Sequence, residues 1–225
     1  MFHERRLITA IVTVLAAACA ASSPVQATPP SSLPGVAMSD VDTLVLQPGS
    51  EGVDTYVYSL QPTANFGTVA WLHATGLPYA EAFVRFDLSS ILPGSTILSA
   101  EIELWGEYRD GTLTFAPVAS TWDEAVVTWN TKPGSTVPEV THPIDTCSSG
   151  CSKTFEIADV VRYVVDHPQS ECGTKITGNT PSIGWMLGSS DNPTPSRRPK
   201  LTVLYVAGGV PVAPAGWGGV KSTYR

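Results

Sequence analysis

The chain has 225 residues, with 13 Lys and Arg against 20 Asp and Glu and a formal net charge of −7. This length allows one domain of ordinary size with appended segments. Because proteins bind nucleic acid through a basic surface that contacts the phosphates, the acidic balance excludes nucleic acid as the expected partner.

Residues 1–27 have the features of an export signal. Arg5 and Arg6 precede an apolar run from Leu7 to Ala18, and Val25-Gln26-Ala27 forms a small-residue cleavage site. The apolar run is too short to span a bilayer, which needs about 20 residues. We therefore expect a soluble, secreted protein, and its mature part keeps 11 Lys and Arg against 19 Asp and Glu.

A second processing route starts from Ala16-Ala17-Ala18-Cys19, which resembles the box before the lipidated cysteine of bacterial lipoproteins. Lipidation of Cys19 would anchor the chain at a membrane surface. The other interpretation is release after Ala27, with Cys19 only a small apolar residue of the signal. A membrane partner is expected only if Cys19 is lipidated.

Composition divides the mature chain into three parts. Residues 28–35 are rich in Pro and Ser and are typical of a linker. Residues 208–225 are rich in Gly, Ala, Pro and Val and are typical of a flexible tail. Residues 36–207 contain no convincing internal repeat, which predicts one continuous domain.

Most of this domain is predicted to be strand. Turn residues separate short runs of β-branched and aromatic residues, and Asp110-Gly111 between two alternating runs predicts a β-hairpin. Many short strands at this spacing predict an all-β antiparallel sandwich. The predicted strands are 43–46, 55–58, 70–74, 82–88, 98–108, 113–118, 126–129, 183–188 and 201–206.

The clearest alternation runs from Ala100 to Tyr108. Ala100, Ile102, Leu104 and Tyr108 share one face, which we expect to be core. Glu101, Glu103, Trp105 and Glu107 share the other face, which should meet solvent. A large aromatic residue on a solvent-facing strand is unusual enough to be a candidate for binding.

One short helix is predicted after the middle of the chain. Ile157, Val160, Val161 and Val164 follow the spacing of one helical face, and His167-Pro168 ends the run. A helix of about three turns would cap one end of the sandwich.

Three cysteines remain after removal of the signal: Cys147, Cys151 and Cys172. Export makes a disulfide the expected state of two of them, and any pair of the three is open. Zinc is the rival interpretation, but His142 and His167 do not give a zinc-finger spacing with these cysteines.

Seven segments come in an order and spacing that resemble a known family. They are Asp54-Thr-Tyr-Val-Tyr-Ser59, Ala64-Asn-Phe-Gly67, Phe83-Val-Arg-Phe-Asp-Leu-Ser89, Ser99-Ala-Glu-Ile-Glu-Leu-Trp105, Thr121-Trp-Asp-Glu-Ala-Val-Val-Thr-Trp-Asn130, Phe155-Glu-Ile-Ala-Asp159 and Arg198-Pro-Lys-Leu-Thr-Val-Leu-Tyr205.

From about residue 43 to 206 the chain resembles the DNRLRE domain, also classed as family-96 carbohydrate-binding modules. The resemblance implies a secreted bacterial sandwich of jelly-roll type. Such domains are usually appended to polysaccharide lyases, glycoside hydrolases or cell-surface proteins. Some of them bind alginate or related acidic glycans through basic groove residues.

Three residues are the candidate ligand-binding residues. Trp105 could stack its indole on the apolar face of a sugar ring, unless a loop or strand covers it. Arg85 could hold a uronate carboxylate with two parallel hydrogen bonds, unless it pairs with a strand glutamate. Lys132 could assist a sugar site beside Trp129, or it is a solvated turn lysine.

Catalysis is not indicated by any motif. The chain contains no nucleophile elbow, zinc-protease helix or phosphate loop. Glu101 and Glu103 have the spacing of a glycosidase carboxylate pair. Any two residues that lie two apart on a strand have this spacing, so a solvent-facing strand explains these glutamates better. No cofactor is expected except structural calcium, for which residues 40–42, 51–54 and 190–192 offer oxygen ligands.

The sequence therefore predicts a non-catalytic module that recognises a polysaccharide, acidic or neutral, by aromatic stacking and charged hydrogen bonds. The alternative is a structural or adhesive cell-surface domain without glycan affinity, for which lipidation of Cys19 is expected. A third hypothesis is a glycan-cleaving enzyme, which requires a deep cleft with two converging carboxylates.

Overall fold

The computed structural model describes residues 40–77, 79–168, 172–180 and 185–208. The predicted signal and linker, and all but Gly208 of the predicted tail, lie outside these described residues. Within the described residues, no helix has the length and apolar character needed to cross a membrane.

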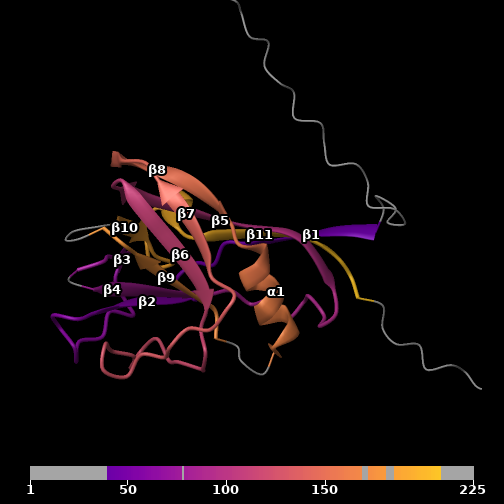
Figure 1. The fold of residues 1–225 in the computed structure, drawn as a ribbon, viewed down its shortest axis with the longest axis horizontal. Coiled ribbons are helices and arrows are strands. Elements are labelled where there is room, and N and C mark those ends of the chain that lie inside the picture. The colour runs from indigo at the N-terminus through magenta and orange to yellow at the C-terminus, as the bar shows by residue number, and fades with distance from the viewer. Residues whose placement is uncertain (1–39, 78, 169–171, 181–184, 209–225) are drawn as a thin grey trace, which may run out of the picture. The chain divides into compact units, whose positions relative to one another are not determined.

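Two antiparallel sheets form a β-sandwich, and most connections carry the chain from one sheet to the other, as in a jelly roll (Figure 1). Sheet A has the order β1-β11-β5-β10-β3, with β8 also paired to β5, and sheet B has the order β2-β4-β9-β6-β7. Sheet A contains β1 (Val41–Leu46), β3 (Trp71–Ala74), β5 (Thr96–Tyr108), β8 (Cys147–Glu156), β10 (Trp185–Gly188) and β11 (Lys200–Val206). Sheet B contains β2 (Val53–Tyr58), β4 (Ala80–Arg85), β6 (Gly111–Pro117), β7 (Val140–Ile144) and β9 (Thr174–Gly178).

The predicted all-β sandwich with one short helix is confirmed, and two local predictions are wrong. Residues 126–129 form turns instead of a strand, because the backbone N–H groups of Val126 and Val127 both donate to the Asp123 carbonyl. Asp110-Gly111 does not close a hairpin, since β5 and β6 lie in different sheets. The turn instead carries the chain across the sandwich edge.

The core lies between the sheets, where the alternation of β5 places its apolar face. Ala100, Ile102, Leu104 and Tyr108 are all fully buried, as the sequence predicts. Trp185 is the largest fully buried side chain, and its indole donates a 2.9 Å hydrogen bond to the Arg109 carbonyl.

Gly178 leaves the space that the Trp185 ring occupies. A Cβ at position 178 would lie 1.7 Å from ring carbon Cζ3 of Trp185, far inside van der Waals contact. We therefore expect Gly178→Ala to lower the free energy of unfolding by about 1–3 kcal/mol, the usual penalty for overpacking. Urea denaturation measures it, with Gly134→Ala as control, because nothing lies within 4 Å of that Cβ. Equal stability of the two variants would contradict the described packing.

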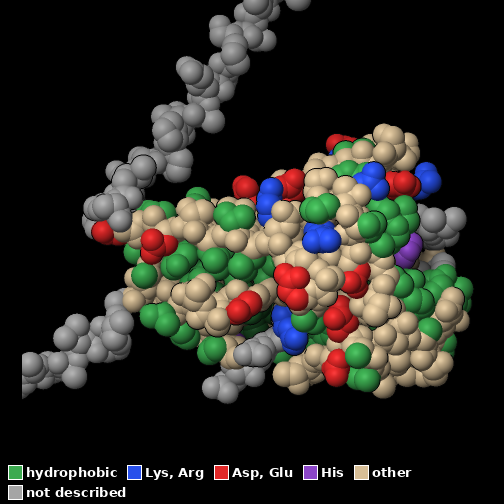
Figure 2. All heavy atoms as spheres, turned by 180° about the vertical axis from the view of Figure 1, so that it is seen from behind, with side chains coloured by type: hydrophobic (Ala, Val, Ile, Leu, Met, Phe, Trp, Pro, Cys, Tyr) green, Lys and Arg blue, Asp and Glu red, His purple; other side chains and the backbone are tan. Residues whose placement is uncertain are grey.

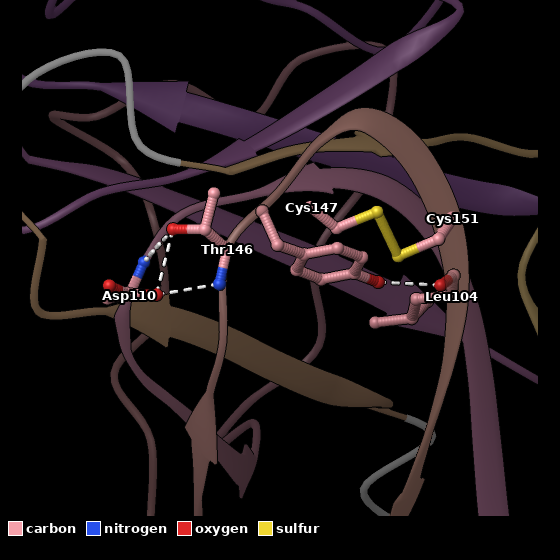
Figure 3. The surroundings of a disulfide bond; sticks show 6 residues. Leu104, Asp110, Thr146, Cys147 and Cys151 are labelled. Carbon is pink, nitrogen blue, oxygen red and sulfur yellow. Dashed lines mark hydrogen bonds between the residues drawn. A yellow bond between two sulfur atoms is a disulfide. The ribbon is translucent and has the colours of Figure 1, made fainter. Parts of the chain in front are cut away.

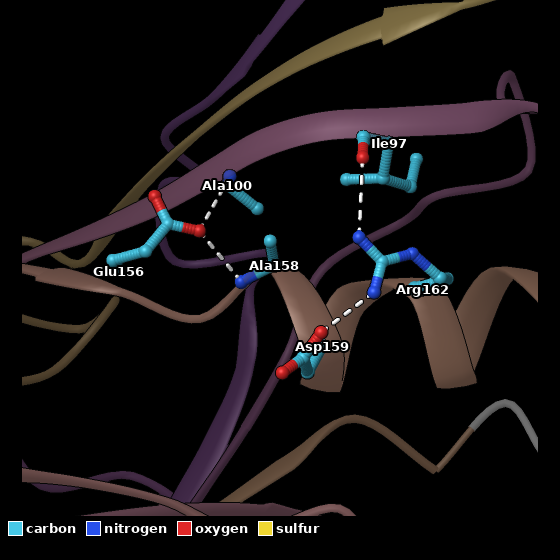
Figure 4. Close-up of polar contacts among 6 residues, drawn as sticks. All are labelled: Ile97, Ala100, Glu156, Ala158, Asp159 and Arg162. Carbon is cyan, nitrogen blue, oxygen red and sulfur yellow. Dashed lines mark hydrogen bonds and ion pairs between the residues drawn. The ribbon is translucent and has the colours of Figure 1, made fainter.

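The helix α1 (Ala158–Asp166) forms where predicted and packs against β5 and β6. Glu156 fixes its start, since one carboxylate oxygen accepts hydrogen bonds from the N–H groups of Ala158 and Ala100, at 2.8 and 3.1 Å (Figure 4). Arg162 pairs with Asp159 and donates to the Ile97 carbonyl of β5. These contacts hold the N-terminal half of the helix against β5 of sheet A.

A disulfide between Cys147 and Cys151 resolves the pairing that the sequence leaves open, and Cys172 is a buried thiol. The disulfide lies at the start of β8, where Tyr108 donates a 2.6 Å hydrogen bond to the Leu104 carbonyl (Figure 3). Between the end of β5 and the start of β8, the Asp110 carboxylate accepts hydrogen bonds from both the backbone N–H and the hydroxyl of Thr146.

Candidate functional site

The three predicted binding residues do not converge. Trp105 projects from β5 on the outer face of sheet A, on the side opposite the buried Leu104. Arg85 ends β4 on the outer face of sheet B, on the same side as Phe83. Lys132 belongs to the segment 118–136, which packs over that same outer face. Arg85 and Lys132 thus share a face that Trp105 does not.

The indole of Trp105 is half-buried and already has neighbours. The Arg197 guanidinium lies over it, 4.1 Å from the ring centroid, and the Trp71 ring lies 5.5 Å away, centroid to centroid. The backbone of Gly150 in β8 approaches so closely that a Cβ there would clash with the indole. Trp105 therefore is not a bare platform, because an arginine occupies the stacking position.

Charge on the outer face of sheet A is mainly negative. Glu101, Glu103 and Glu107 project from β5, and Lys200 forms an ion pair with Glu103. Hydrogen bonds from Lys200 and from the Ser152 hydroxyl lower the pKa of Glu103 below its ordinary value, so it stays ionised. This face would repel an acidic glycan.

Arg85 lies at the wall of a cavity of ≈ 870 Å³ between the end of β4 and the end of α1. Its guanidinium carbon lies 5.6 Å from the Trp122 ring centroid, a cation–π distance. Phe86, Leu88 and Ile91 add apolar lining. Figure 2 shows hydrophobic side chains gathered around a hollow on one face of the domain, with acidic side chains beside it.

Lys132 is held in a cluster of charges on the outer face of sheet B. Its ammonium lies 2.6 Å from Glu81 Oε1 and 4.2 Å from the centroid of the Trp129 ring. A second ammonium, that of Lys175 in β9, lies 3.8 Å from Glu81 Oε2, which is too far for a hydrogen bond. Two cations thus share one carboxylate, and these three groups carry one excess positive charge.

An aromatic pair adjoins these charges. The rings of Tyr79 and Trp129 are almost parallel, with an interplanar angle of 15° and centroids 6.3 Å apart. Tyr79 is 47% exposed, and it is the only Phe, Tyr or Trp in the described part of the chain that is classed as exposed. We call Tyr79, Glu81, Trp129, Lys132 and Lys175 the sheet-B cluster.

Sequence reasoning missed Tyr79 and Lys175. Tyr79 could have been found from the sequence. It follows Leu77-Pro78 at the turn into β4, and an aromatic side chain in a turn is expected to be exposed. Lys175 could not have been found, since the strand that carries it was not predicted.

Hydroxyl groups extend the surface of the sheet-B cluster across the sheet. Thr177 of β9 lies opposite Glu81 of β4, and Thr114 of β6 lies opposite Thr177. The hydroxyl of Thr114 is hydrogen-bonded to that of Thr141 on β7, at 2.8 Å. Such hydroxyls are ordinary partners for sugar hydroxyl groups.

The segment that carries Trp129 and Lys132 is anchored to the sheet at several points. Trp122 is 8% exposed and donates a 2.6 Å hydrogen bond to the Cys172 carbonyl. The Asn65 amide donates to the carbonyls of Glu124 and Val127, at 2.7 and 2.9 Å. These bonds hold Trp129 and Lys132 in place before any ligand binds, which reduces the entropy lost on binding.

The sequence model of carbohydrate-binding module family 96 matches residues 49–205. The chain belongs to this family. The match extends from just before β2 into β11, so it covers all of sheet B and most of sheet A of this family-96 module. The predicted resemblance is therefore confirmed, and carbohydrate is the class of partner that the family binds. No curated protein matches the module at a significant level.

Proposed function

We propose that the chain is a secreted, non-catalytic module that binds an acidic polysaccharide on the outer face of sheet B. Tyr79 and Trp129 stack on sugar rings, and Lys132 and Lys175 bind uronate carboxylates. The observation that carries this proposal is the continuity of the sheet-B cluster, in which each side chain contacts the next.

Electrostatics supports the choice of sheet and of ligand class. A charged hydrogen bond is roughly twice as strong as a neutral one, and it is strengthened further where solvent is excluded. The side chains of Lys132 and Lys175 are only 21% and 16% exposed. A carboxylate that reaches them would therefore be bound by partly desolvated cations, despite the acidic charge of the whole chain.

The other two predicted residues have secondary roles in this proposal. Arg85 lies four positions along β4 from Glu81 on the same face, and it binds a further carboxylate of a longer chain. Trp105 belongs to the opposite sheet, and its contact with Arg197 stabilises the outer surface of sheet A.

A glycan panel tests the function. Isothermal titration of the purified protein against polymannuronate, polyguluronate, polygalacturonate and neutral β-glucan should give binding to at least one polyuronate. Reducing-end assays on the same mixtures should detect no product. Release of oligosaccharides would contradict the non-catalytic part of the proposal. Absence of binding to every polymer would favour the structural or adhesive alternative.

Lys175→Gln should weaken polyuronate binding while leaving stability almost unchanged. The variant removes one ammonium but leaves the closer pair between Lys132 and Glu81 intact. We expect affinity to fall roughly 10-fold, the equivalent of about 1.4 kcal/mol, and to depend less on salt concentration. Titrations at low and high NaCl measure both effects. The control is Lys153→Gln on β8, which should bind like the parent.

A further inference from the structure

Asp54 is a buried carboxylate with an unsatisfied oxygen. It belongs to β2, is 2% exposed, and accepts a 2.7 Å hydrogen bond at Oδ2 from the Ser190 N–H. Its other oxygen, Oδ1, is buried and has no hydrogen-bond partner. A buried carboxylate oxygen without a hydrogen-bond partner costs free energy, so a missing partner is expected.

Other oxygen groups gather at the same place from distant parts of the chain. Glu124 accepts a 3.0 Å hydrogen bond from the Asp54 N–H, and Asp191 is close enough to act on both carboxylates. Burial raises the pKa of Asp54 to about 7, and it also raises the pKa of Glu124. Acidic side chains therefore meet here, and the Arg85 guanidinium offsets part of their charge at Glu124.

Ser190 supplies an independent observation. The residue is fully buried, and its hydroxyl has no hydrogen-bond partner. The hydroxyl nevertheless lies by the Asp54 carboxylate, close enough to lower its pKa against the effect of burial. A Cβ at Gly52 would lie 2.8 Å from this hydroxyl oxygen, so a side chain there would fill the space beside it.

We infer that a calcium ion binds between β2, the segment 118–136 and the β10–β11 connection. Asp54 Oδ1, a Glu124 carboxylate oxygen and the Ser190 hydroxyl are the side-chain ligands, and Asp191 adds negative charge. Among the described residues, no three or more His, Cys, Asp or Glu side chains are grouped so that they could hold a metal ion by themselves. The ligand set is therefore mixed, with two carboxylates and neutral oxygens, which suits calcium better than magnesium or zinc.

The ion would connect three segments that the sequence keeps apart. Residue 54 begins sheet B, residue 124 lies in the segment that carries Trp129 and Lys132, and residue 190 follows β10 of sheet A. An ion at their junction stabilises the folded protein by mass action, since the unfolded chain cannot offer the same ligands. This inference does not depend on the proposed glycan binding.

Thermal unfolding of the full chain tests the site. After dialysis against EDTA, adding calcium should raise the Tm by about 5 °C or more in a saturable way. Magnesium at the same concentration should have a much smaller effect. Asp54→Asn should lose the calcium response, and Asp145→Asn, which alters an exposed carboxylate, should keep it.

Glu124→Gln is a second test of the site in case Asp54→Asn fails to fold. It keeps an oxygen for the Asp54 N–H but removes one charge, so calcium affinity measured by titration calorimetry should fall at least 10-fold. A parent protein whose Tm ignores calcium would overturn the inference. So would an undiminished calcium response in both the Asp54 and the Glu124 variants.

Discussion

A variant with Tyr79→Ala and Trp129→Ala should bind polyuronate much more weakly than the parent while the protein stays folded. Each stacked ring contributes about 0.5–1.5 kcal/mol beyond the apolar area that it buries, and each 1.4 kcal/mol changes affinity 10-fold. Removal of both rings should therefore weaken binding roughly 100-fold. Titration calorimetry measures the affinity, and circular dichroism confirms the fold.

The matched control is the double variant Trp71→Ala and Trp105→Ala. It truncates two aromatic residues that also contact each other, but on the outer face of sheet A. It should keep the parent affinity for polyuronate. If the sheet-A variant loses binding and the sheet-B variant retains it, the assignment of the site to sheet B is wrong.

Trp122→Ala should lower the free energy of unfolding by about 3–5 kcal/mol, as for other large core truncations. Trp122 belongs to a small apolar cluster apart from the main core, where its ring contacts Phe83 of β4. Its indole N–H donates a hydrogen bond to the Cys172 carbonyl. Loss of this anchor should also weaken glycan binding, because the segment that carries Trp129 and Lys132 would no longer be held. Urea denaturation and calorimetry measure the two effects.

Trp122→Phe separates packing from hydrogen bonding. It keeps a six-membered ring against Phe83 but removes the indole donor together with the smaller ring, so we expect a smaller loss of about 1–3 kcal/mol. A loss of less than about 1 kcal/mol for Trp122→Ala would mean that the segment 118–136 is anchored by its other contacts.

The fold was predictable where alternation and turn residues agreed. From Ala100 to Leu104 of β5 the apolar and polar residues alternate strictly, so the buried face followed directly from the sequence. The helix was equally clear, because its valines repeat at helical spacing. Both patterns involve residues that are close in sequence, and the folded protein agrees with both.

Other strands could not be predicted because their residues are not apolar enough. Cys147-Ser-Ser-Gly-Cys151 at the start of β8 contains none of the residues that favour strands, and its strand character comes with its pairing to β5. Thr174–Gly178 is short and half-polar. Residues 126–129 were predicted to be a strand but form turns, because hydrogen bonds to Asp123 outweigh the strand preference of the β-branched side chains.

The site was predictable only where its residues are close in sequence. Lys132 and Trp129 are close in sequence, and their contact was anticipated. The positions of Tyr79 and Lys175 beside them depend on the pairing of β4 with β9, which no local pattern encodes. The choice of Trp105 as a platform rested on its solvent-facing position, which is correct, but Arg197 comes from a distant segment to cover it.

The most direct test of the central claim is an NMR titration of the isotope-labelled protein with a uronate oligosaccharide. The account predicts chemical-shift changes concentrated at Tyr79, Trp129, Lys175 and Thr177, with the Trp129 indole N–H among the largest. Changes concentrated at Trp71 and Trp105 would contradict it, and so would a spectrum that no uronate or neutral oligosaccharide alters.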